Sequence, residues 1–596
     1  MLSFKERLSS LRQLMARYQL DACILPSNDP HQSEYVADHW KTREWISGFS
    51  GSAGVVVVTQ DHAGLWTDSR YFLQAEQELK QSGLVLHKQG IPHAPEHLDW
   101  VFDNLPESSK VGVDGMLFSE LQVNQLRAKF ATKNITLHTD LDFIEPIWPD
   151  RPPLPQSAVF EMSTEQVGQS RSEKLALIQN QLEPGAYYLI TALDSIAWVL
   201  NIRAADVPYN PVCISYLLVG KNSSHWFVDG EKVNADLQAR LAQDAIQLHP
   251  YGQISDFLQQ LKPEAMLAYS PALTSSKLLG WAKAARKLQM EDLITPAKAI
   301  KNATEIAQLK KAMIKDGVAL LRLFRWLENG LQEKTILKEY DISLQLDAFR
   351  REQGDYFGES FATIAGYAAN GAIIHYHPDS QNSAIVRSEG ILLLDSGGQY
   401  LQGTTDITRT IALGQPSDDQ KKHYTLVLKG HIALAKVRFL AGTKGAQLDT
   451  LARLPLWSAG LNYGHGTGHG VGAFLNVHEG PQGLTHDLLN PRGQVAFVPG
   501  MLTSNEPGFY LDGQYGIRIE NLILCVESSP SDYGQYLEFE TLSLFPINLE
   551  MADLSLLNAD EKAWLNDYHQ QVFATLAPHL KPEEVAWLEK QCQSIE

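Results

Sequence analysis

Four carboxylates and one imidazole in the C-terminal part of the chain have the types and the order expected of a metal site. Asp395 follows a strongly apolar run, Ile391–Leu394, and Asp406 lies within a second apparent strand, Thr404–Ala412. The pattern predicts a hairpin that brings the two aspartates within reach of each other. A buried aspartate needs a partner such as a metal ion. For Asp406 alone, hydrogen bonding to turn amides is the alternative.

Two histidines four residues apart, His465 and His469, lie in a segment with five glycines, Tyr463–Gly472. So many glycines disfavour a regular helix and favour a loop whose backbone lies close to a ligand. The pair lacks the glutamate of the His-Glu-x-x-His zinc signature. Its spacing alone leaves two interpretations open, a metal site or ordinary core and surface histidines.

Two further acidic residues follow, Glu506 before Pro-Gly and Glu520 in Gly-Ile-Arg-Ile-Glu. If the second segment is a strand, side-chain alternation puts Arg518 and Glu520 on one face, and Ile517 and Ile519 on the other. An Arg and a Glu would then share a site. For either segment by itself, a cross-strand salt bridge is the alternative.

Together these residues form an oxygen-rich set whose charge matches two divalent cations; its members are Asp395, Asp406, His469, Glu506 and Glu520. Such a set suits hard or borderline ions, with manganese favoured and cobalt, iron or zinc as alternatives. Two ions ~3.5 to 4 Å apart that share a hydroxide would supply a nucleophile at neutral pH and polarise a carbonyl. The chemistry indicated is hydrolysis of an amide.

Several domains must position these residues, because 596 residues exceed one core at roughly 100 to 200 residues per domain. Five prolines between Glu145 and Pro155 predict an extended connection. A long helical pattern, 300–329, begins a further domain. We therefore expect an N-terminal domain at 1–150, a middle domain at 151–298, a third domain at 299–548 and a helical C-terminal extension at 549–596.

The first two of these domains resemble each other. Each has a β-branched or apolar run and then a Trp close to an Asp, at Trp66–Asp68 and at Trp226–Asp229. Apolar strand runs next to helical segments, such as 71–81 and 233–241, predict α/β units whose sheets are covered by helices. We infer an internal duplication. The alternative is two unrelated α/β domains with generic strand patterns.

Composition excludes several classes of protein. Lys plus Arg number 50 against 69 for Asp plus Glu, and the net charge of −19 disfavours unaided binding to nucleic acid or to an acidic membrane. The four cysteines form no CxxC pair, which fits a reducing cytoplasm. No apolar run approaches the ~18 residues of a membrane span, and residues 1–20 predict an amphipathic helix instead of a signal peptide. We expect a cytoplasmic protein without nucleic-acid or membrane partners.

The motifs around the five residues also carry a resemblance to a known family. They are Asp-Ser-Gly-Gly at 395–398, Thr-Thr-Asp-Ile-Thr-Arg-Thr at 404–410, His-Gly-Thr-Gly-His-Gly at 465–470, Glu-Pro-Gly at 506–508 and Gly-Ile-Arg-Ile-Glu-Asn at 516–521. This series resembles the pita-bread metallopeptidases and, within them, the three-domain Xaa-Pro aminopeptidases of the cytosolic type. The resemblance spans essentially the whole chain. It implies two related, creatinase-like α/β domains followed by an α+β pita-bread catalytic domain.

The same resemblance implies a role for each site residue. Asp395 would be a terminal ligand of one metal, Asp406 and Glu520 would bridge both metals, and His469 and Glu506 would complete the second. The catalytic residues that it implies are His375, His465, His478, Glu506 and Arg518. The three histidines would bind substrate, stabilise the oxyanion and move protons. Arg518 would keep nearby carboxylates ionised.

The activity implied is that of a manganese-dependent exopeptidase that releases the first residue of peptides with proline at the second position. An Xaa-Pro bond is a tertiary amide without an N–H, so general peptidases that need this donor handle it poorly. A homodimer is expected by resemblance alone. Two alternatives remain, a prolidase restricted to Xaa-Pro dipeptides and a catalytically silent pita-bread module that binds peptides or proteins.

The sequence departs from the usual family pattern just before Glu506. Ser504 and Asn505 stand there, where an acidic residue is more usual. Neither departure removes a ligand. A change at this place is expected to alter the hydrogen bonds around Glu506, and thereby metal affinity or pH optimum.

Overall fold

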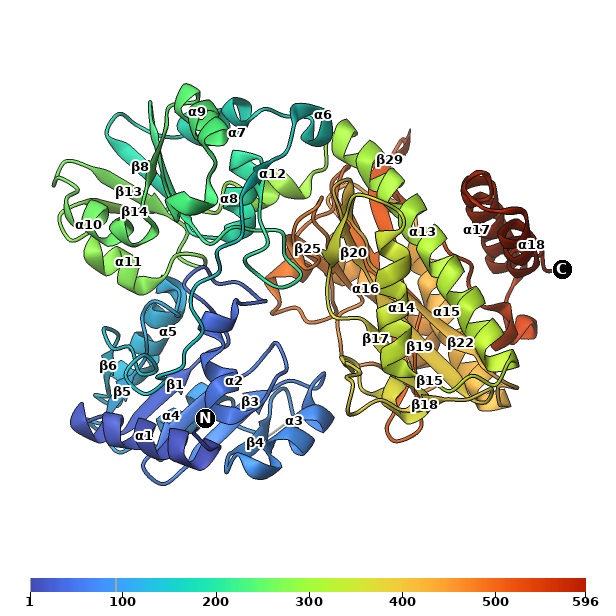
Figure 1. The fold of residues 1–596 in the computed structure, drawn as a ribbon, viewed down its shortest axis with the longest axis horizontal. Coiled ribbons are helices and arrows are strands. Elements are labelled where there is room, and N and C mark those ends of the chain that lie inside the picture. The colour runs from blue at the N-terminus through green and yellow to red at the C-terminus, as the bar shows by residue number, and fades with distance from the viewer. Residues whose placement is uncertain (1, 92–93) are drawn as a thin grey trace. The chain divides into compact units, whose positions relative to one another are not determined.

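The computed structural model describes residues 2–91 and 94–596. The chain divides into two compact units, of which the N-terminal unit ends at Ile294 and the C-terminal unit begins at Thr295 (Figure 1). In the described parts of the chain, no helix combines the length and the apolar content that crossing a membrane requires.

The N-terminal unit contains two six-stranded sheets with the same topology. The first sheet has the order β4-β3-β2-β1-β5-β6, and the second has the order β12-β11-β10-β8-β13-β14. In each, the third strand of the order pairs antiparallel with both neighbours, and the other three pairings are parallel. Chance similarity of strand patterns does not reproduce order and direction together, so the predicted duplication is confirmed.

The strands of these two sheets are short and mostly buried, as helix-covered sheets require. The first comprises β1 Ala22–Leu25, β2 Val55–Thr59, β3 Ala63–Thr67, β4 Val85–Lys88, β5 Lys110–Gly112 and β6 Thr136–His138. The second comprises β8 Ala186–Ile190, β10 Tyr216–Gly220, β11 Ser224–Phe227, β12 Ile246–His249, β13 Met266–Tyr269 and β14 Arg286–Gln289.

Helices in the N-terminal unit follow the predicted segments. The amphipathic N-terminal helix is α1, Phe4–Arg17, which a Ser3 capping box starts. The segments near 71 and 233 form α3, Phe72–Glu78, and α9, Ala235–Gln243. Residues 145–155 contain no helix, as their prolines predict.

Long helices cover the sheets of the C-terminal unit. The longest is α13, Ala303–Gln332, whose first turn is capped by Asn302. Figure 1 shows α14, Glu339–Arg351, lying along it, and the terminal helices α17, Ala559–Leu576, and α18, Pro582–Gln591, also pack on α13. A second pair is formed by α15, Asp418–Ala435, and α16, Gly445–Ser458. The predicted C-terminal helical region is thus two helices.

Three sheets of this unit position the predicted site. One has the order β17-β19-β22, formed by Ile364–Tyr367, Ile391–Ser396 and Ile407–Ala412. The largest has the order β23-β30-β29-β26-β24-β25, formed by Phe439–Leu440, Gly534–Thr541, Asn521–Ser531, Leu502–Asn505, Gly468–Gly470 and Glu479–Leu484. The third pairs β27, Gly508–Leu511, with β28, Tyr515–Arg518.

Some predicted boundaries are wrong. The strand expected at Thr404–Ala412 is broken, because Gly403–Thr404 pairs with β20, Gly398–Tyr400, while β22 pairs with β19. The chain changes sheets at Thr405 and Asp406, so Asp406 lies outside both strands. Helix α15 ends at Ala435, and Phe439 begins β23.

Candidate metal centre

The ends of paired strands bring the two aspartates together. In the antiparallel pair of β19 and β22, Asp395 lies opposite Thr408, two residues after Asp406. Both aspartates are buried. The predicted proximity of Asp395 and Asp406 is therefore confirmed, although it comes from a change of sheet and not from a simple hairpin.

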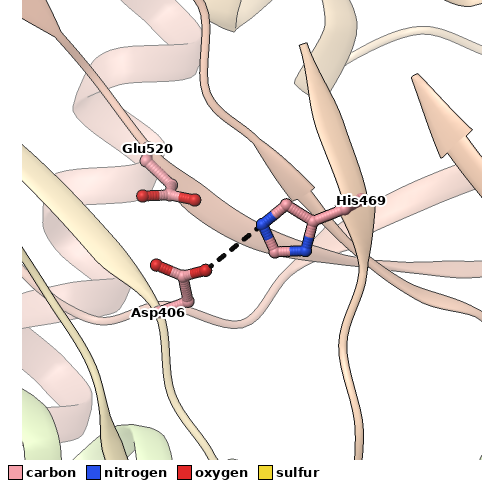
Figure 2. Close-up of side chains that lie close together, drawn as sticks. All are labelled: Asp406, His469 and Glu520. Atoms are coloured by element: carbon pink, nitrogen blue, oxygen red, sulfur yellow. Dashed lines mark ion pairs between the residues drawn. The ribbon is translucent and has the colours of Figure 1, made fainter. Parts of the chain in front are cut away.

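Three side chains converge closely enough to share one ion. Ligand atoms of Asp406, His469 and Glu520 all lie within 4.8 Å of one another, and Figure 2 shows the side chains pointing toward a common centre. The His469 Nε2 atom lies 3.5 Å from Asp406 Oδ2. These residues come from three separate parts of the unit: the chain before β22, strand β24, and the crossing between β28 and β29.

The other two predicted ligands border this triad. Glu506 Oε1 lies 3.5 Å from His469 Nε2. Asp395 receives a hydrogen bond from Arg518 on Oδ2, at 2.7 Å, while its Oδ1 is buried without a hydrogen-bond partner among the described residues. A buried carboxylate oxygen without a partner is costly, and a cation would compensate it.

The His469 ring is oriented for metal binding. Its Nδ1 lies 3.0 Å from the Gly470 carbonyl, which can only accept, so Nδ1 carries the proton and donates. The Nε2 lone pair therefore faces the carboxylates of Asp406 and Glu506, both acceptors at 3.5 Å. Metal-binding histidines commonly have this second hydrogen bond, which sets the tautomer.

Electrostatics also indicate a missing positive charge. Burial, together with the charges of neighbouring carboxylates, raises the pKa of Asp406 and of Glu520 well above the usual range. Burial raises the pKa of Glu506 to about 7, against the lowering effect of Arg518. Arg518 lowers the pKa of Asp406 and Glu506, as its fixed positive charge predicts, while desolvation by burial acts more strongly in the opposite direction. Divalent cations would reverse this balance.

The residues present therefore fit a divalent-metal group. Three buried carboxylates, the partly buried Glu506 and one correctly oriented imidazole supply oxygen and nitrogen donors, and the cluster contains no thiolate. Hard or borderline ions prefer such donors. The two-metal ligand set itself stays a prediction.

Two side chains, Arg518 and Tyr510, connect Asp395 with His465. Arg518 donates to Asp395 and also, through Nη1, to the Tyr510 hydroxyl at 2.5 Å. The Tyr510 oxygen lies 2.8 Å from His465 Nε2. Since His465 Nδ1 donates to the Gly466 carbonyl at 2.7 Å, the neutral ring accepts the Tyr510 proton at Nε2. Arg518 and Tyr510 together orient the ring.

Ser504 links two predicted ligands. Its hydroxyl accepts from the His469 backbone N–H at 2.9 Å and donates to Glu506 Oε1 at 3.2 Å. The next residue, Asn505, is tied to His431 of α15 through both its carbonyl and its side-chain amide. The expected effect of Ser504 and Asn505 on metal affinity or pH optimum stays a prediction.

The remaining predicted histidines lie next to the cluster. The ring of His478 is 4.4 Å from the ring of His469, nearly perpendicular to it. His375 is partly buried, and the carbonyl of Ile374 before it accepts from Arg518 Nη2 at 3.4 Å. All nine residues predicted for the site thus belong to the same region of the C-terminal unit, around Arg518 and His469.

Sequence reasoning missed Tyr510. It lies four residues after Glu506, on β27, and pairs with Gly516 of β28. Tyr510 could have been predicted from strand pairing. It lies opposite Gly516, which is on the same strand face as Arg518. Sequence reasoning also missed two buried charges of α16, Asp449 and Arg453.

Models of known protein families match most of the chain. The family model for metallopeptidase family M24 matches residues 307–527, and that for its C-terminal region matches 535–595. Two models of the creatinase/prolidase N-terminal domain match 7–142 and 150–305. These matches confirm the expected fold class, two related α/β domains before a pita-bread domain.

Named relatives align along almost the full length. A probable Xaa-Pro aminopeptidase P of Laccaria bicolor is 40% identical, over 99% of this chain and 93% of its own. Aminopeptidase P2 of Arabidopsis thaliana is 39% identical, over 97% of this chain and 86% of its own. The crystal structure of an X-prolyl aminopeptidase from Caenorhabditis elegans, described as cytosolic with a di-nuclear active site, is 34% identical and covers 100% of both chains with a TM-score of 0.95. The chain therefore belongs to the Xaa-Pro aminopeptidase P group of metallopeptidase family M24.

Proposed function

We propose that the protein is a manganese-dependent aminopeptidase that removes the first residue of peptides whose second residue is proline. The convergence of Asp406, His469 and Glu520 within 4.8 Å carries the proposal, because this cluster can hold a cation and lies in the region that matches metallopeptidase family M24. Full-length similarity to proteins named Xaa-Pro aminopeptidases supports the substrate class.

We assign five residues that would hold two divalent ions: Asp395, Asp406, His469, Glu506 and Glu520. The buried, partnerless Asp395 Oδ1 and the orientation of His469 Nε2 support these roles. When bound, two divalent ions lower the pKa of water and polarise a carbonyl. Manganese suits an oxygen-rich set best, with cobalt or zinc as alternatives.

Proton transfer in this proposal belongs to Glu506. Glu506 accepts a proton from the attacking water and returns it to the leaving proline nitrogen. It is suitably placed, because its Oε2 lies 4.0 Å from His465 Nδ1 and its Oε1 is held by Ser504. A positioned carboxylate can first accept a proton and then donate it.

The histidines act on the substrate carbonyl. We assign His465, oriented by Tyr510, and His478, which packs on His469, to oxyanion stabilisation and proton movement. His375 binds the substrate backbone. Arg518 supports the centre from behind Asp395 and holds Tyr510. Oriented donors contribute because they need no reorganisation when charge develops.

The organisation of the chain completes the proposal. The four domains are 1–150, 151–298, 299–548 and 549–596, which the extents of the four family models support. We propose a cytoplasmic homodimer. The description of the C. elegans relative as cytosolic supports the compartment.

The deciding experiment strips the purified protein with a chelator and then restores manganese, cobalt or zinc. A short Xaa-Pro-Xaa peptide and an Xaa-Pro dipeptide are supplied in parallel. Release of the first residue from the longer peptide, restored best by manganese, is the expected result. Activity on the dipeptide alone would favour a prolidase. Binding of two ions without any hydrolysis would favour the silent peptide-binding module.

A further inference from the structure

Helix α16 carries an ion pair beneath the glycine-rich segment of the site. Asp449 and Arg453 are one helical turn apart, with Nε 2.7 Å from Oδ2, and neither side chain is exposed to solvent. Pairs at this spacing usually lie on helix surfaces. Burial costs both charges their hydration, so a buried pair is weak evidence for stability. The remaining contacts of the two side chains indicate another purpose.

Arg453 binds the backbone of the segment that leads to the metal site. Its Nη1 donates to the Tyr463 carbonyl at 2.8 Å and to Asn462 Oδ1 at 3.2 Å, and its Nη2 donates to the His465 carbonyl at 2.7 Å. The guanidinium also lies 3.9 Å from the centre of the Tyr463 ring. A planar fork of donors can hold two carbonyls in one geometry, which the single ammonium of lysine cannot.

Asp449 holds the other end of the same segment. Its Oδ1 accepts a hydrogen bond from the Thr467 hydroxyl at 2.5 Å. The Tyr463 hydroxyl oxygen lies 2.5 Å from the same Thr467 oxygen. The Thr467 carbonyl in turn accepts from the Glu506 backbone N–H at 2.9 Å. The pair on α16 is thereby connected to both histidine positions and to Glu506.

The segment cannot supply this rigidity itself. Glycines stand at 464, 466 and 468, and glycine has the greatest backbone freedom of any residue. At Gly468 glycine is required, because a Cβ there would collide with the Ser504 carbonyl. A segment that must be rich in glycine and yet hold His465 and His469 needs anchors from outside.

We propose that Asp449 and Arg453 are positioning residues of the metal centre, fixing the backbone at 462–467 and so the placement of His465 and His469. The proposal rests on the proposed function, because it assumes that His469 binds metal and that His465 acts on substrate. Neither residue of the pair contacts those imidazole rings directly, so each acts through the backbone.

The test uses Arg453→Lys in the full-length protein. Lysine keeps the charge opposite Asp449 but cannot hold both carbonyls. We expect the variant to remain folded, to bind Mn²⁺ about 10- to 100-fold more weakly, and to change the visible spectrum of the Co²⁺-loaded protein. With saturating metal, kcat should fall at least about 10-fold while KM stays within about 2-fold. The matched control is Arg351→Lys, from an exposed pair with Asp347 at the same spacing, which should change none of these quantities.

A second variant removes no charge. Thr467→Val deletes the hydroxyl that joins Asp449 to the segment, and Thr467→Ser restores it. We expect weaker Mn²⁺ binding for valine and recovery for serine. Wild-type metal affinity, Co²⁺ spectrum and kcat in both Arg453→Lys and Thr467→Val, with only a lower melting temperature, would overturn the proposal. If the wild type hydrolyses no Xaa-Pro peptide, the proposed function fails, while the metal affinities and spectra still decide the positioning role.

Discussion

Two buried aspartates, one in each unit, are compensated differently. In the N-terminal unit, the buried Asp206 is fully compensated, because it receives the Lys232 ammonium at 2.7 Å, the Ile214 N–H at 2.7 Å and the Ser157 hydroxyl at 2.5 Å. In the C-terminal unit, Asp395 keeps a buried oxygen without a partner among the described residues. The carboxylate of Asp206 is satisfied by the protein itself, whereas that of Asp395 has an oxygen that a cation could bind.

Several buried cations of the C-terminal unit lie next to residues of the proposed site. Arg350 pairs with Asp316 and donates to the Gly397 carbonyl, two residues after Asp395. Arg453 holds the segment of His465, and Lys298 and Lys301 both pair with Glu479, next to His478. Each cation lies beside a residue of the proposed site. Charges of this kind fix geometry, and their removal should affect function more than similar losses in the N-terminal unit.

The largest effect is expected from Asp406→Asn. Loss of this proposed ligand should lower the number of bound ions from two and reduce peptide hydrolysis by at least about 10³-fold. Metal analysis after dialysis and steady-state kinetics measure both effects. Asp355→Asn, at an exposed aspartate that pairs with Lys315, is the control. Full activity with two bound ions in Asp406→Asn would contradict the assignment.

A smaller loss is expected along the chain from Arg518 to His465. His465→Ala should lower kcat about 10²-fold, because a histidine proposed to move protons during the reaction is removed. Tyr510→Phe leaves the imidazole in place and removes only its orienting hydroxyl, so its loss should be smaller. Kinetics at saturating metal compare the two variants. If kcat fell further in Tyr510→Phe than in His465→Ala, the Tyr510 hydroxyl and not the His465 ring would have the main catalytic role.

Lys232→Met tests the buried ion pair with Asp206 in the N-terminal unit. It leaves Asp206 buried without its cation, which should cost the N-terminal unit about 3 to 5 kcal/mol of unfolding free energy. The Mn²⁺ affinity should not change. Urea unfolding and metal titration measure these quantities, and Lys88→Met, from an exposed pair with Glu76, should cost less than about 1 kcal/mol. A weakened metal site in Lys232→Met would remove the contrast between the units.

The smallest effect concerns pH. In the metal-free protein, the pKa of Glu506 is raised from 4.5 to about 7, so the folded state holds this proton more tightly than the unfolded state. Its stabilising contribution is complete below pH 4.5 and is lost as pH rises through about 7. Metal-free wild type should therefore lose stability relative to metal-free Glu506→Gln between pH 5 and 8. Urea unfolding of both proteins would show it, and parallel pH curves would contradict it.

The accuracy of sequence-based prediction varied with how local each feature is. The predicted helices α1 and α13 appear within a few residues of their expected limits, since capping and apolar spacing are local signals. The break at Thr405 and Asp406 was missed, because it depends on tertiary pairing. The part of the segment before the break pairs with β20, and the part after it pairs with β19. The members of the site were predictable from residue type and motif.

By itself the sequence determined which donors exist, in what order they occur, and that two similar α/β domains precede them. Only the tertiary structure decided which charges lose their water and which partners compensate them. Asp449 and Arg453 have the spacing of a surface pair, and Tyr510 lies 45 residues from His465, yet all four are buried or partly buried in one network. Desolvation and hydrogen bonding depend on every neighbour in space, and most of those neighbours are distant in the chain.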